Sequence, residues 1–141
     1  MKKKVSIIVC AIGAMLIAAA CQSKPDTSQY PELILGQWIC TYEKQVNMQG
    51  QIISENNDIG YVREFRSDGS FTDIFPNGPS ITGEWTIEKD AITIHYPTTP
   101  APSVLNGKVK KLTDKSLELD MRLTSTEISG YIDRSEKYER R

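Results

Sequence analysis

Two neighbouring segments indicate the fold most directly: Phe65-Arg66-Ser67-Asp68-Gly69-Ser70-Phe71 and Ile81-Thr82-Gly83-Glu84-Trp85-Thr86-Ile87-Glu88. The pair Asp68-Gly69 reverses the chain, because glycine accepts a positive φ and the aspartate caps the turn. In the second stretch apolar residues alternate with polar ones, which is typical of a strand with one buried and one wet face. The sequence therefore predicts β-hairpins at this point.

The same period of two continues along the rest of the chain. Turn-forming residues separate the alternating segments, and no stretch after Cys21 supports a long amphipathic helix. The fold class is therefore all-β and antiparallel. We expect about eight strands, near residues 37–47, 51–55 or 59–65, 70–75, 80–88, 91–96, 104–112, 116–123 and 128–139. With no helix to cover the apolar faces, the sheet must close on itself or fold into a sandwich.

The first residues, Met1 to Cys21, resemble a bacterial lipoprotein signal peptide. Lys2-Lys3-Lys4 precedes an apolar run of 16 residues, Val5 to Ala20, and small residues lead into Cys21. At about 1.5 Å per residue the run falls short of a ~30 Å hydrocarbon core, which favours a cleaved signal. The resemblance implies that residues 1–20 are removed and that Cys21 is lipidated. An ordinary secretory signal and an uncleaved anchor are the alternatives.

Residues 21–32 are predicted to be the lipidated cysteine and a flexible tether, and residues 33–141 the folded domain. The segment 22–29 contains no large apolar residue, and Pro25 and Pro31 oppose a helix. Gln22 is not the aspartate that resembles an inner-membrane retention signal. We therefore expect an outer-membrane lipoprotein that faces the periplasm.

Maturation changes both the cysteine count and the charge. Cys10 lies within the signal and Cys21 is modified, so that Cys40 alone remains, and its strand pattern predicts a buried thiol without a disulfide. The whole chain has 17 basic and 18 acidic residues, and removal of three lysines leaves 14 and 18, a net charge of −4. This balance argues against nucleic acid as a partner and leaves the lipid as the membrane attachment.

Several motifs together resemble those of small bacterial lipocalin-like lipoproteins. These motifs are Gly36-Gln37-Trp38, Phe65 to Phe71 with its Asp-Gly turn, Gly83-Glu84-Trp85-Thr86-Ile87, and the closing Lys137-Tyr138-Glu139-Arg140. The resemblance implies an up-and-down barrel of about eight strands whose interior is filled or holds one small ligand. It also implies a barrel plug made by Trp38, Trp85, Phe65 and Phe71, with Arg140, or secondarily Arg134, stacked over Trp38.

Catalysis has little support in the sequence. His95 is the only histidine, and strand alternation places it opposite Ile94 and Tyr96, facing solvent. No Cys/His cluster has metal-ligand spacing and no glycine-rich phosphate loop is present. We therefore expect no catalytic residues, no metal, no cofactor and no enzyme activity.

Binding is better supported, by one strand face. Tyr61, Arg63 and Phe65 share a face, and if that face points inward, Arg63 needs a partner, for which Asp73 on the next strand is the natural choice. One interpretation is an internal ion pair that only fills the barrel. The other is an anchor for a ligand carboxylate or phosphate, with Tyr42, Tyr96 and Met121 lining the pocket.

The leading functional hypothesis is a monomeric, membrane-anchored, lipocalin-like protein that binds a small apolar or amphipathic ligand in the barrel or at its mouth. The alternative is a structural or protein-interaction module of the cell envelope with a fully packed barrel.

Overall fold

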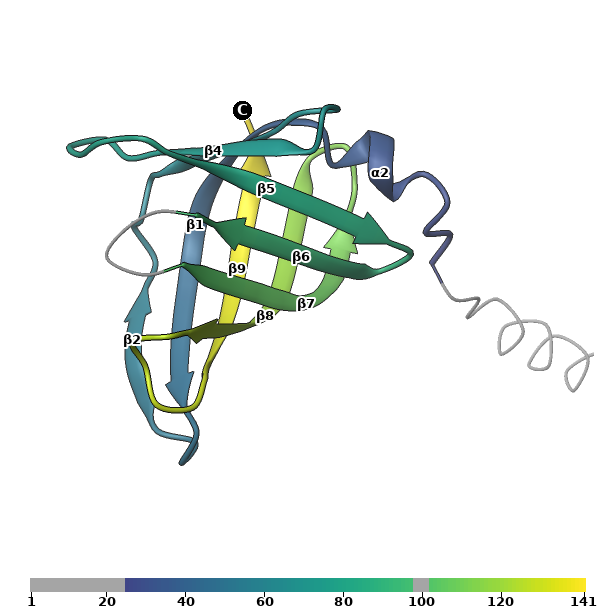
Figure 1. Ribbon diagram of the computed structural model, residues 1–141. Helices are drawn as coiled ribbons and strands as arrows, with labels where there is room; N and C mark the ends of the chain where they lie inside the picture. The colour runs from purple at the N-terminus through teal and green to yellow at the C-terminus, as the bar shows by residue number, and fades with distance from the viewer. Residues whose placement is uncertain (1–24, 98–101) are drawn as a thin grey trace, which may run out of the picture.

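A computed structural model describes residues 25–97 and 102–141 and shows an all-β domain with one helical turn (Figure 1). This confirms the predicted fold class. The elements are α2 (Tyr30–Leu33), β1 (Gly36–Asn47), β2 (Ile52–Asn56), β3 (Val62–Phe65), β4 (Ser70–Ile74), β5 (Ile81–Glu88), β6 (Ala91–Tyr96), β7 (Ser103–Leu112), β8 (Ser116–Ser125) and β9 (Ile132–Arg140).

The strands form a closed antiparallel barrel. From β3 to β9 each strand pairs with the next one along the chain. β1 pairs with β3 on one side and with β9 on the other, so that the barrel has eight strands, β1 and β3 to β9. The barrel fulfils the expectation of closure, which removes the exposed edges that an open meander would leave.

The sequence predicted one strand, either at 51–55 or at 59–65. The structure has a strand in each place, β2 and β3. β3 pairs with the first residues of β1, Gly36 to Ile39, whereas β2 pairs with later residues of the same strand, from Glu43 to Val46. The two short strands therefore lie along one edge of β1, and the hairpin of β1 and β2 projects at the end of the barrel far from α2 (Figure 1).

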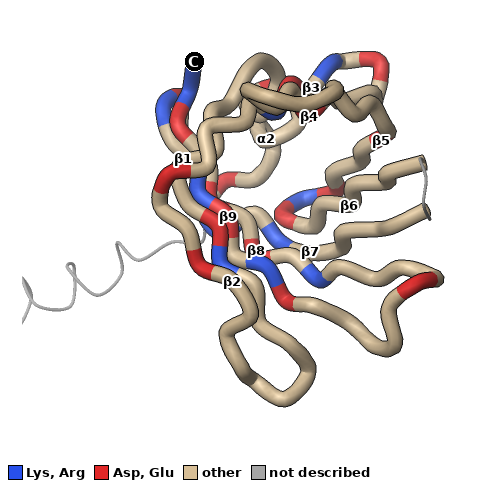
Figure 2. Tube along the Cα trace, turned by 90° about the vertical axis from the view of Figure 1, so that its left-hand side faces the viewer, with Lys and Arg blue, Asp and Glu red and all other residues tan. Residues whose placement is uncertain are grey.

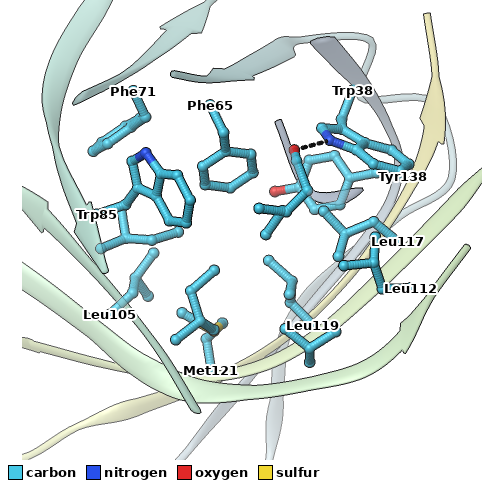
Figure 3. Packing of buried hydrophobic residues seen from close by; sticks show 14 of the residues in the cluster. Trp38, Phe65, Phe71, Trp85, Leu105, Leu112, Leu117, Leu119, Met121 and Tyr138 are labelled. Atoms are coloured by element: carbon cyan, nitrogen blue, oxygen red, sulfur yellow. Dashed lines mark hydrogen bonds between the residues drawn. The ribbon is translucent and has the colours of Figure 1, made fainter. Parts of the chain in front are cut away.

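One end of the barrel is closed by large apolar side chains. Trp38, Phe65, Phe71 and Trp85 are all buried there, and Figure 3 shows them facing one another across the interior. Phe65 lies directly opposite Phe71 in the register of β3 and β4, and its ring meets Trp85 edge-on with centroids 5.1 Å apart. The four residues expected to plug the barrel thus share one end of it.

Arg140 covers this closed end. Its guanidinium lies 3.9 Å from the centre of the Trp38 ring and donates hydrogen bonds to the backbone oxygens of Leu33 and Leu35. The Trp38 indole N–H donates to the oxygen of Ile34 at 2.7 Å. These contacts connect the last strand, the first strand and the segment before it. Arg134, the second candidate for this stacking position, lies elsewhere.

The folded part begins earlier than the predicted tether allows. Tyr30 is buried and α2 spans Tyr30–Leu33, with Pro31 in its first turn. Proline opposes a helix interior but suits the first turn, where its missing N–H has no partner to lose. The signal peptide, Cys21 and residues 22–24 lie outside the described residues. Among residues 25–97 and 102–141, no helix has the length and apolar character required to cross a bilayer.

Candidate functional site

Arg63 lies inside the barrel and has no exposed surface. Strand pairing places it opposite Asp73, and the guanidinium donates from Nε to Asp73 Oδ1 at 2.8 Å and from Nη2 to Oδ2 at 2.9 Å. This two-point geometry is the strong form of an arginine–carboxylate pair. The partner that the sequence suggested for Arg63 is therefore the one it contacts.

A second carboxylate, which the sequence analysis missed, completes the coordination of Arg63. Glu136 of β9 is buried and accepts from Arg63 Nη1 at 3.2 Å. Its other oxygen lies 2.6 Å from Arg134 Nη2, and Arg134 also donates to Glu43 of β1. The signal was present in the alternation of β9, which places Arg134, Glu136 and Tyr138 on one face of the strand.

Three tyrosines complete this charged layer, which we define as Arg63, Asp73, Glu136, Arg134, Glu43, Tyr61, Tyr96 and Tyr138. The Tyr96 hydroxyl donates to Asp73 Oδ2 at 2.7 Å and accepts from Arg63. The Tyr138 hydroxyl donates to Glu136 at 2.7 Å and lies 2.7 Å from the hydroxyl of Tyr61. Because Tyr138 uses its own proton for Glu136, Tyr61 donates to Tyr138.

Burial and the two arginines shift the pKa values of Glu136, Tyr61 and Tyr138 in the charged layer. Burial alone would raise the pKa of Glu136, but Arg134 and Arg63 outweigh that effect and hold the pKa below its ordinary value. Burial raises the pKa of Tyr61 and of Tyr138 well above the ordinary value, so that both stay protonated and able to donate. Three carboxylates face two guanidinium groups, which leaves the layer with a formal charge of −1.

Arg63 itself has little capacity left for a ligand. Its Nε and both terminal nitrogens already donate to Asp73, Tyr96 and Glu136. The group that is not satisfied is Arg134 Nε, a buried N–H that lacks a hydrogen-bond partner among the described residues. Glu136 Oε1 also lacks a well-directed hydrogen bond, but its 2.6 Å contact with Arg134 Nη2 pairs it electrostatically.

Tyr42 does not belong to this layer. The register between β1 and β9 shifts between Cys40 and Tyr42, so that Trp38 and Cys40 face inward, Tyr42 faces outward and Glu43 faces inward again. The Tyr42 hydroxyl instead donates to the exposed Glu55 on β2. The expectation that Tyr42 lines the interior is wrong, because the extra residue of a β-bulge exchanges the two faces of a strand.

Met121 is buried on the inner face of β8, directly opposite Arg134 in the register of β8 and β9.

Four apolar residues at or near the strand ends are only half buried, at the mouth of the barrel opposite the closed end. Three of them, Ile59, Phe75 and Leu123, pack against the core, and the fourth, Ile132, pairs with Leu123 in the register of β8 and β9. We call these four residues the apolar rim. The charged layer thus lies between a filled apolar end and a partly exposed apolar rim.

His95 is exposed, as expected from the alternation of β6. Within the described part of the chain, no group of three or more His, Cys, Asp or Glu side chains is placed to bind a metal ion. Cys40 is buried, and burial, with a smaller contribution from Glu136, raises the pKa of its thiol to about 12.

Comparison with known proteins gives one family. A family model described as the lipocalin-like domain matches residues 34–119, more than half of the chain and the region from β1 to the middle of β8. No curated protein and no solved structure matches the chain. The matched region contains Trp38, Arg63, Asp73 and Trp85, and it coincides with most of the closed barrel. The chain belongs to the family of lipocalin-like domains.

Proposed function

We propose that this protein binds one small amphipathic ligand at the mouth of its barrel. The observation that supports this most is the buried, unsatisfied N–H of Arg134, which lies two residues from Ile132 of the apolar rim along β9. An unpaired buried donor is unfavourable, and a ligand acceptor that reached it would remove that cost. Barrels of this size can hold one small ligand, and we propose binding, not catalysis, as the role of this lipocalin-like domain.

Because one end of the barrel is filled by side chains, we place the ligand at the mouth and not in the deep interior. Trp38, Phe71 and Leu117 have no exposed surface, and the ring of Trp85 packs against Phe65. The charged layer then separates this core from the apolar rim. A ligand at the rim contacts apolar side chains with one part and polar groups with the other.

The charge balance favours an uncharged head group. Because the layer carries a formal charge of −1, a carboxylate would be repelled by Glu43 and Glu136, which flank Arg134 on both sides. A hydroxyl or ester oxygen accepts from Arg134 Nε without that repulsion. We therefore expect an uncharged, single-chain amphiphile as the ligand class.

A titration of the chain from Gln22 onward, which contains every described residue, tests the proposal. Calorimetry with monododecanoylglycerol, dodecanoate and dodecylammonium compares one alkyl chain with three head groups. We expect the uncharged probe to bind about tenfold more tightly than the anion. Equal affinity for all three probes would contradict the head-group argument.

A matched pair of variants tests the location. Leu123→Asn at the apolar rim should weaken binding of the uncharged probe about tenfold, since it removes part of the apolar contact. Leu33→Asn changes a half-buried leucine near the closed end and should leave the affinity unchanged. If Leu33→Asn weakened binding of the uncharged probe more than Leu123→Asn did, the site would lie near the closed end and the proposed location would be wrong.

The second candidate function is a packed structural or protein-interaction module of the cell envelope. The near saturation of Arg63 by Asp73, Glu136 and Tyr96 favours it, because these contacts leave the guanidinium little capacity to bind a ligand. This alternative predicts no binding of any of the three amphiphiles.

We also propose a lipid anchor at Cys21 and a periplasm-facing position on the outer membrane, supported by the signal-like residues 1–20 and by Gln22 after the cysteine. Changing Cys21 to Ser should release the protein from the membrane fraction. Unchanged fractionation of that variant would exclude the lipid as the attachment.

A further inference from the structure

A hollow of about 540 Å³ lies on the outside of the barrel, where the N-terminal segment passes the turn between β5 and β6. The N-terminal segment contributes Pro25, Thr27 and Tyr30. The opposite wall is formed by Lys89 and Asp90 of the turn and by β7, including Lys108 and Lys110. In Figure 2 basic segments of β7 lie beside this turn.

Three ammonium groups and one carboxylate line this hollow, whereas the chain from Cys21 onward carries an excess of acidic residues. The existing ion pairs are loose. Lys108 is 3.9 Å from Asp90 with 69% of its side chain exposed, and Lys110 is 3.7 Å from Asp120 with 59% exposed. Such exposed pairs contribute little, so that both ammonium groups can turn toward another anion.

The turn that carries Lys89 is held against β7. The backbone N–H of Val109 donates to the oxygen of Asp90 at 2.8 Å, and Ala91 pairs with Lys108. Lys89 has a φ of +56°, and it is the one non-glycine residue with a positive φ in the described parts of the chain. A β-branched or bulky residue would be strongly disfavoured in this conformation. The backbone pairing of the turn with β7 therefore holds Lys89 close to Lys108 and Lys110, whatever rotamers their side chains adopt.

The position of the hollow along the chain indicates its partner. Four peptide units separate Pro25 from Cys21, and a fully extended chain of that length spans at most about 14 Å. A lipid on Cys21 therefore keeps the hollow within reach of the phospholipid head groups of the same leaflet. This step rests on the lipid anchor in the proposed function.

We propose that the hollow binds the phosphate of an anionic phospholipid, so that the barrel lies against the membrane with the turn of Lys89 and the outer face of β7. The lipid on Cys21 supplies retention, and the lysines fix the orientation. Each lysine near an anionic surface contributes about a fivefold gain in affinity. The ligand-binding mouth then faces away from the point where the tether leaves the domain.

Lysine footprinting of the full, lipidated chain in nanodiscs tests this inference. The acylation rates of Lys89, Lys108 and Lys110 are measured by mass spectrometry in nanodiscs of phosphatidylcholine and in nanodiscs that also contain phosphatidylglycerol. We expect about a fivefold slower reaction in the anionic nanodiscs. Lys44 and Lys137, on β1 and β9, line a separate hollow that also includes Lys110, and their rates should fall less than the rate of Lys89.

Charge-matched variants separate a specific site from general attraction. Lys108→Gln with Lys110→Gln should abolish the protection of Lys89, whereas Lys44→Gln with Lys137→Gln, which removes the same charge, should preserve it. Equal rates in both kinds of nanodisc would overturn the inference. So would equal protection by inorganic phosphate in phosphatidylcholine nanodiscs, because the site would then recognise free phosphate. Loss of the chain from both nanodiscs would instead contradict the lipid anchor.

Discussion

Arg63 is the residue on which the interior of the barrel depends most. It has no exposed surface and balances two buried carboxylates, Asp73 and Glu136. Removing one partner of a buried ion pair is more costly than the pair is stabilising, because the remaining charge stays buried without compensation. We predict that Arg63→Met lowers the free energy of unfolding by about 3–5 kcal/mol, measured by urea denaturation with tryptophan fluorescence.

The matched control is Arg122→Met. Arg122 makes a two-point ion pair with Asp133, but about half of each side chain is exposed. Solvent screens such a pair, and its loss should cost less than about 1 kcal/mol. Similar losses for the two variants would contradict the assignment of the charged layer as buried and coupled.

Glu136 makes the free energy of unfolding depend on pH in the acidic range. The arginines hold the pKa of Glu136 below its ordinary value of 4.5 in the folded protein. The ionised carboxylate therefore stabilises the fold above that pH, and this stabilisation is lost as the pH falls through the folded-state pKa. We predict that the free energy of unfolding declines below pH 4.5, and that Glu136→Gln makes the decline shallower. An unchanged slope in urea titrations would contradict the role of Glu136.

The pairing of Arg63 with Asp73 was predictable from the sequence, whereas the contact with Glu136 was not. The alternation of residues 61–65 put Arg63 on the same face as Phe65 and made Asp73 its partner if that face pointed inward, since both lie on short, regular strands. Glu136 lies far away in sequence, and the barrel closes β9 onto β1 only in three dimensions. The pairing of Arg63 with Glu136 therefore depends on closure, which periodicity does not specify.

Among the individual strands, β5 shows most clearly how one small residue permits close packing. A Cβ built at Gly83 would collide with the carbonyl oxygen of His95 and lie 2.7 Å from the Phe71 ring. Gly83→Ala should destabilise the protein by about 1–3 kcal/mol, as overpacking of a filled core does. Gly78→Ala is the control, since its Cβ would meet only the Phe75 side chain, at an ordinary 3.6 Å. Equal melting temperatures for the two variants would contradict this account of the packing.

The elements with a regular period of two were predictable, and the irregular ones were not. The turn at Asp68-Gly69 forms as expected, with Gly69 at a φ of +84° and Asp68 accepting from the N–H of Ser70. The shift of register near Thr41 was not predictable, because a bulge leaves the composition of a strand unchanged. The same reason accounts for the misplacement of Tyr42.

In the whole barrel β1 pairs with β3 on one side and with β9 on the other, so that it cannot leave without breaking both sets of hydrogen bonds. Cys40 lies in β1, is buried, and has a thiol whose pKa burial raises to about 12. We predict that in the chain from Gln22 onward Cys40 reacts with a disulfide reagent only after unfolding, with labelling that follows the urea transition. Rapid labelling of the native protein at neutral pH would show that β1 opens locally.

A diffraction experiment can locate a ligand bound at the amphipathic mouth of the barrel. Crystals of the protein with a monoglyceride whose alkyl chain ends in bromine would locate the ligand by anomalous scattering. We predict bromine beside the apolar rim, near Leu123 and Phe75, with the head group oxygen next to Arg134 Nε. Bromine between Trp85 and Leu117, or its absence from the barrel, would contradict the proposal.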